Sequence, residues 1–125
     1  MHELIAEKGR IRIKIEATLL GEDLLLAISG GGRPHIGAAA LSVPRPSLAD
    51  PGFNSASTSV LTLTGHKDDD LARMVSASLA SKLNTNVIVV CGVHLDGITR
   101  EEIDTVCRIA MESAEVIVKL LNESN

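Results

Sequence analysis

The feature that most constrains this fold is a change in the spacing of its apolar residues near residue 70. Before that point, apolar residues come in short runs or alternate with polar ones, which is typical of β-strands. Over residues 70–83 they recur every three or four positions, which predicts an amphipathic helix. A short apolar run at residues 86–91 predicts a further strand, and residues 99–121 predict a second helix. The predicted order is therefore β-β-β-β-α-β-α.

Four strands are expected in the first half of the chain. Residues 10–16 alternate strictly between isoleucine and charged side chains, which predicts a strand with one solvated face. Residues 24–28 are continuously apolar, as in a central strand. Residues 36–43 and 58–64 supply the third and fourth strands, and the loop between them, residues 44–57, holds three of the four prolines.

These elements predict one α/β (α+β-like) domain over residues 1–125, with a mixed sheet of about five strands and both helices on one face. A right-handed crossover would make strands 58–64 and 86–91 parallel. The opposite face would then be left open, partly polar and partly apolar, and a partner subunit is expected to cover it. We therefore expect a homo-oligomer. No strand is predicted in residues 1–9, and His2 is expected in a mobile terminus.

Composition excludes several classes of protein. The chain has a net charge of −4, one Phe and neither Trp nor Tyr, which argues against nucleic-acid binding. Its apolar runs are far shorter than the roughly 20 residues of a membrane span, and the N-terminus lacks the pattern of a signal peptide. Cys91 and Cys107 form no CxxC pair and fit core packing. The expected location is the cytoplasm.

Three histidines lie at predicted strand boundaries beside glycine: His35, His66 and His94. If strands 36–43 and 58–64 are antiparallel, and strands 58–64 and 86–91 are parallel, all three histidines fall at one end of the sheet. A hairpin between strands 24–28 and 36–43 would bring the glycine run after residue 29 to the same end. Ligands favour the carboxyl ends of parallel strands, and glycine-rich turns beside helix N-termini suit anions. The predicted ligand-binding residues are Gly30, Gly31, Gly32, Arg33, His35, His66, Lys67, His94 and Asp96.

Each of these signals has an ordinary structural alternative. A single histidine at a strand end is as often a turn residue as a ligand-binding one, and a glycine run is usually a flexible turn. The run is neither a P-loop nor a dinucleotide-binding fingerprint. The aspartates at positions 68–70 are more typical of a solvated helix start than of a metal site, and Asp96 is more typical of a turn than of a catalytic base.

The motifs GGGRPHIG at residues 30–37, GHKDD at 65–69 and GVHLD at 92–96 resemble the LpdD-like family of prenylated-flavin chaperone-like proteins. The resemblance covers roughly residues 10–118. It implies a protein without enzymatic activity that helps a UbiD-type decarboxylase to handle prenylated FMN. Proteasome-assembly-chaperone-like folds are a more distant analogy with a similar implied architecture.

Two classes of function follow. The first is a binding or chaperone protein for prenylated FMN, FMN or a similar phosphate-bearing cofactor, in which Arg33 and Lys67 supply positive charge. The alternative is a small metal-dependent hydrolase that uses His35, His66 and His94, since three imidazoles and a water form a known zinc arrangement. Against the hydrolase, no HxH or HxxxH spacing preassembles ligands. A pure assembly factor without a ligand is a third possibility.

Overall fold

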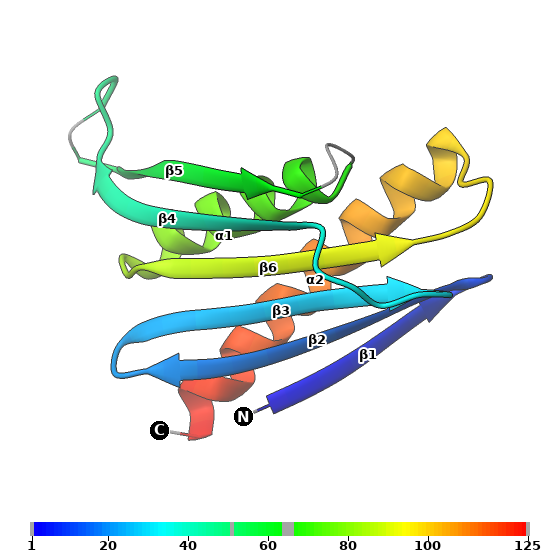
Figure 1. Cartoon of the computed structure of the whole chain (residues 1–125). Coiled ribbons are helices and arrows are strands. Elements are labelled where there is room, and N and C mark those ends of the chain that lie inside the picture. The colour runs from blue at the N-terminus through cyan, green and yellow to red at the C-terminus, as the bar shows by residue number, and fades with distance from the viewer. Residues whose placement is uncertain (1, 51, 64–66, 125) are drawn as a thin grey trace.

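The computed structural model describes residues 2–50, 52–63 and 67–124. It contains one six-stranded sheet with the strand order β1-β2-β3-β6-β4-β5 and two helices (Figure 1). The elements are β1 (His2–Lys8), β2 (Ile11–Leu20), β3 (Asp23–Gly31), β4 (Ala38–Pro46), β5 (Asn54–Thr62), α1 (Lys67–Leu83), β6 (Val87–His94) and α2 (Arg100–Ser124). The mixed α/β fold predicted from the sequence is confirmed.

Strand β6 occupies the middle of the sheet. It pairs in parallel with β3 and antiparallel with β4, while the pairs β1–β2, β2–β3 and β4–β5 are all antiparallel. Strands β5 and β6 therefore run in the same direction, as the crossover through α1 requires, with β4 between them. The expected hairpin between the second and third predicted strands is wrong, because β6 separates β3 from β4. The continuously apolar sequence of β6 is typical of a central strand, and its side chains are buried on the helix-covered face and half-buried on the other.

The N-terminus forms a strand that the sequence analysis did not assign. Strand β1 pairs with β2 along its length, from His2 opposite Ala17 to Lys8 opposite Ile11. Gly9 makes the tight turn between the two strands with φ at +60°, a conformation that glycine adopts without strain. His2 is thus part of the sheet, and the expected mobile terminus is wrong. Apolar and polar residues do not alternate in HELIAEK, because Leu4, Ile5 and Ala6 are consecutive. The strand was missed for this reason.

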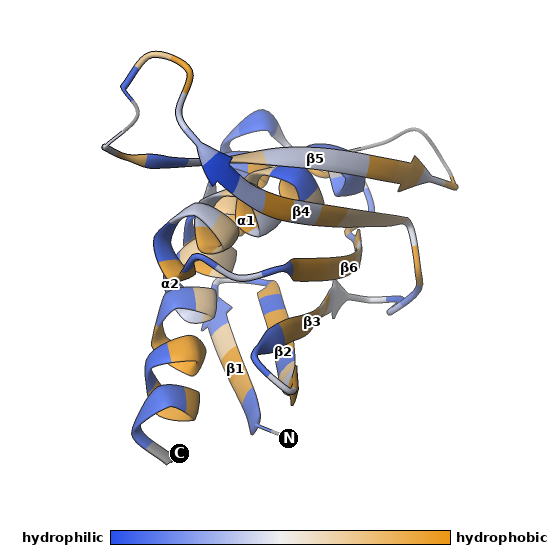
Figure 2. Cartoon of the chain, turned by 90° about the vertical axis from the view of Figure 1, so that its left-hand side faces the viewer, coloured by the Kyte–Doolittle hydropathy of each residue, from blue (hydrophilic) through white to orange (hydrophobic). Residues whose placement is uncertain are grey.

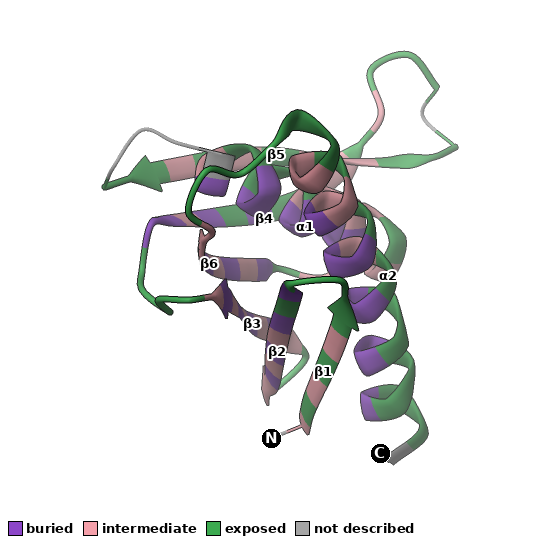
Figure 3. Cartoon of the chain, turned by 90° about the vertical axis from the view of Figure 1, so that its right-hand side faces the viewer, coloured by how far each residue is buried: buried purple, intermediate pink, exposed green. Residues whose placement is uncertain are grey.

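Both helices pack on the same face of the sheet, as predicted (Figures 2 and 3). Helix α1 covers β4, β5 and β6, and α2 covers β1 and β2. The core between the layers is built from aliphatic side chains, with fully buried isoleucine, leucine and valine on the strands and helices, among them Ile13, Ile15, Leu26, Val75, Val89 and Ile117. Neither helix, over the residues described, is both long and apolar enough to cross a membrane.

Candidate functional site

The carboxyl ends of the parallel strands β3 and β6 lie side by side at one end of the sheet, which we call the rim. Gly31 of β3 lies opposite His94 of β6 in the register of the pair. The chain then crosses the end of β6 to reach β4, as Figure 1 shows. This segment, residues 32–37, is held to β6 by a backbone hydrogen bond at each end. The Gly32 amide donates to the His94 carbonyl at 2.9 Å, and the Gly37 amide donates to the Cys91 carbonyl at 2.9 Å.

Glycines permit this crossing because the backbones approach too closely for a side chain. A Cβ on Gly31 would meet the carbonyl of His94, and a Cβ on Gly92 would meet the carbonyl of His35. Gly31 also has φ at +76°, which side-chain-bearing residues rarely adopt. Gly32 has open space around it, but its amide is already engaged by His94. The glycine run therefore shapes the rim, and charge for an anion must come from side chains nearby.

His35 joins the crossing segment to the start of α1. Its Nδ1 lies 3.0 Å from the carbonyl oxygen of Arg33, which only accepts, so Nδ1 donates this hydrogen bond. Its Nε2 lies 3.3 Å from the Asp68 carboxylate. Asp68 is only 6% exposed, and its other oxygen accepts the amide hydrogen of Val93 at 3.0 Å. The contacts of Asp68 fix α1, the end of β6 and the crossing segment relative to one another.

Cys91 lies beneath this cluster and is not a reactive nucleophile. Its thiol is fully buried and lies 4.0 Å from Asp68. Burial raises the pKa of the Cys91 thiol far above its usual value, and the negative charge of Asp68 raises it further. Because the thiolate is the nucleophilic form of cysteine, Cys91 serves as a core side chain, as its sequence position predicted.

An open cavity of about 510 Å³ lies at the rim. Its size falls within the range of roughly 300–1,000 Å³ that is typical of small-molecule sites. The cavity is lined by Arg10, Gly32, Arg33, His94, Leu95 and Asp96. The imidazole Nε2 of His94 lies 2.9 Å from the Asp96 carboxylate within it. The lining combines two guanidinium groups, a histidine, one carboxylate and one aliphatic side chain, so an anionic ligand with an apolar part would be held chiefly through the guanidinium groups.

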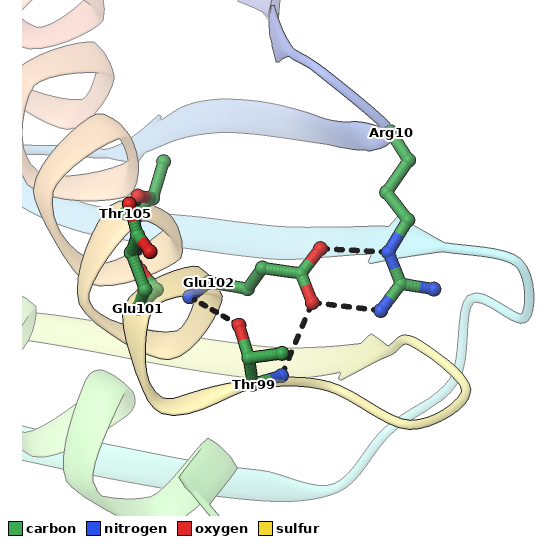
Figure 4. A network of polar contacts seen from close by, with 5 residues as sticks. All are labelled: Arg10, Thr99, Glu101, Glu102 and Thr105. Atoms are coloured by element: carbon green, nitrogen blue, oxygen red, sulfur yellow. Dashed lines mark hydrogen bonds and ion pairs between the residues drawn. The ribbon is translucent and has the colours of Figure 1, made fainter.

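Arg10 is held beside this cavity by the start of α2 (Figure 4). Its Nε and Nη2 donate to the two carboxylate oxygens of Glu102 at 2.6 and 2.8 Å. Glu102 also accepts the backbone amide of Thr99, while its own amide donates to the Thr99 hydroxyl. This reciprocal pair is a capping box, a motif that closes the N-terminus of a helix. The hydrogen bonds from Arg10, followed by that from the Thr99 amide, lower the pKa of Glu102 to about 2, so the carboxylate is charged at neutral pH.

A comparison with known protein families identifies the family of this chain. The family described as the prenylated flavin chaperone LpdD-like domain matches residues 7–122. The chain belongs to this family. The match confirms the resemblance seen in the three glycine-histidine motifs, and two of those motifs form the rim of this LpdD-like domain.

A solved structure shares the fold of the LpdD-like chain. One chain of a crystal structure described as a novel chaperone complex for yeast 20S proteasome assembly superposes with a TM-score of 0.62. The two chains are 12% identical, and the similarity covers 95% of each. At this level of identity the likeness shows the fold alone. No curated protein sequence matches the chain.

The rim of this LpdD-like domain brings together most of the residues predicted to bind a ligand. Gly32, Arg33, His94 and Asp96 line one cavity. Gly30 and Gly31 lie at the end of β3 beside it, and His35 is turned toward Asp68 instead. His66 and the side chain of Lys67 lie outside the described residues, so their predicted roles stay predictions. Among the residues that are described, no group of three His, Cys, Asp or Glu side chains is placed to hold a metal ion.

Two residues of the LpdD-like site were missed by the sequence analysis. Asp68 was interpreted as part of a solvated helix start, but it is buried and bonded to the end of β6. Arg10 was interpreted only as part of the solvated face of a strand, yet it lines the cavity. No local pattern identifies either residue, since both acquire their partners from segments far away in the sequence.

Proposed function

We propose that this chain binds prenylated FMN, or the related FMN, at the rim and assists a UbiD-type decarboxylase as a chaperone without catalytic activity of its own. Membership of the LpdD-like family supports the class of cofactor. The observation that carries the proposal is the cavity at the carboxyl ends of β3 and β6, where two arginines face one open space. A cytoplasmic location is part of the proposal, and the buried free thiol of Cys91 is compatible with it.

The residues present fit a phosphate-bearing cofactor. Arg33 is exposed and lines the cavity, so its guanidinium group can meet a phosphate. Arg10 lines the same cavity, but its charge is largely balanced by Glu102, so Arg33 would be the main cationic contact. The one aromatic side chain, Phe53, lies before β5 and thus at the opposite end of the sheet. A flavin ring would therefore pack against aliphatic groups, and Leu95 lines the cavity. Bound prenylated FMN would supply the cofactor for the partner enzyme, while this chain holds and shelters it.

Titration of prenylated FMN and FMN into the purified chain tests the proposal. We expect saturable binding of at least prenylated FMN, and we expect Arg33→Ala to weaken it roughly 5- to 30-fold, which corresponds to about 1–2 kcal/mol for an exposed charge-assisted contact. Added salt should reproduce part of that loss.

The matched control for this titration is Arg73→Ala, which removes an exposed arginine from α1 without touching the cavity. It should bind both flavins as the wild type does. Absence of binding by either flavin, together with stoichiometric zinc in the purified protein, would replace the proposal with the metal-dependent hydrolase.

A further inference from the structure

The helix-free face of the sheet carries a continuous apolar band. In the register of the strands, Leu25, Ile88 and Leu41 lie side by side across β3, β6 and β4. The next row on this face is Ala27, Val90, Ala39 and Leu61, which continues onto β5. These seven residues and Val43 form what we call the sheet-face band. Leu41, Val43 and Leu61 are 45%, 46% and 75% exposed, which is unusual for large apolar side chains that lie together on a sheet.

Charged residues border the band on one side, and they are already paired with each other. Lys14 of β2 lies 3.5 Å from Glu16 and 3.7 Å from Glu3. Arg12 contacts Glu7 on the neighbouring strand at 3.2 Å. Because these opposite charges neutralise one another locally, this border does not select a strongly acidic or strongly basic partner.

The dimensions of the face match those of a stable interface between two protein chains. Six strands spaced by about 4.8 Å, with roughly eight residues each at about 3.3 Å, cover on the order of 750 Å². A standard interface buries about 800 Å² on each partner. An apolar centre with a polar border is also the usual arrangement of such interfaces.

We propose that a second copy of this chain covers the sheet-face band, in a two-fold symmetric dimer with the helices on the outside. An identical copy presents the same apolar band, so apolar surface meets apolar surface, and each copy keeps its own paired charges. The inference concerns a surface distinct from the rim cavity and does not depend on flavin binding.

Analytical ultracentrifugation of the full chain without ligand tests the dimer. We expect twice the mass of the 13.2 kDa chain at micromolar concentration. Leu41→Lys and Leu61→Lys place charges in the band at positions that are already exposed, so the variants should fold. Combined, they should raise the dimer dissociation constant at least 100-fold, with an unchanged circular dichroism spectrum.

Val116→Lys is the matched control, since Val116 is 49% exposed on α2, away from the sheet-face band. It should leave the dimer intact. A wild-type monomer at tens of micromolar, or an assembly whose mass the two lysines do not change, would overturn the proposal. A wild-type monomer that associates only with a different protein would overturn it equally.

Discussion

Replacing Gly31 by alanine is expected to lower the free energy of unfolding by about 3 kcal/mol. Gly31 has φ at +76°, where a Cβ is strained, and that Cβ would be driven into the carbonyl of His94. The strand ends must therefore separate or the turn must change, and either rearrangement disrupts the hydrogen bond between the Gly32 amide and the His94 carbonyl. Urea denaturation followed by circular dichroism measures the loss.

Gly32→Ala provides the control one position along the chain. A Cβ there meets nothing within 4 Å, and Gly32 does not have a positive φ that would strain alanine. Its free energy of unfolding should stay within about 0.5 kcal/mol of the wild type. Equal losses in the two variants would show that the close approach of β3 and β6 at the rim is not as described.

Asp68→Ala is expected to destabilise the chain by about 2–3 kcal/mol. The substitution leaves the partly buried amide of Val93 without its acceptor and removes the carboxylate that faces His35. It also removes a negative charge from the first turn of α1, where the helix dipole favours one. Thermal and urea unfolding both report the change in stability.

Asp70→Ala separates these contributions. Asp70 lies in the same first turn of α1 but is exposed, so its removal costs only the interaction with the helix dipole, roughly 0.3–1 kcal/mol. If Asp68→Ala is no more destabilising than Asp70→Ala, then Asp68 is the solvated helix-start residue that the sequence alone suggested, and its contacts with β6 contribute nothing.

Much of the fold was accessible from the sequence because periodicity reports local structure directly. The strict alternation in β2, the apolar stripe of α2 and the capping residues Thr99 and Glu102 each depend on neighbours within a few positions. The placement of His35 and His94 at one end of the sheet followed from strand directions: strands 36–43 and 58–64 were expected to be antiparallel, and the crossover makes strands 58–64 and 86–91 run the same way. None of these predictions needed the complete strand order of the sheet.

Strand order and long-range partners were not accessible in the same way. The continuously apolar sequence of β6 is typical of a central strand, but it does not show that β6 lies between β3 and β4. Strand β1 is stabilised by its pairing with β2, and its own pattern is weak. Likewise, Arg10 reaches the rim only because α2 begins beside it, with Glu102 located 92 residues away in the sequence.

Nuclear magnetic resonance of the ¹⁵N-labelled chain during titration with prenylated FMN tests the ligand-binding role of the rim most directly. We expect saturable changes in the amide signals of Gly32, Arg33, His94 and Asp96, which line the rim cavity. Signals at the opposite end of the sheet provide the internal control, because a second cavity of about 300 Å³ lies there, lined in part by Leu83, Asn84 and Asn122. Saturable changes confined to that second cavity, or no changes at all, would contradict the account.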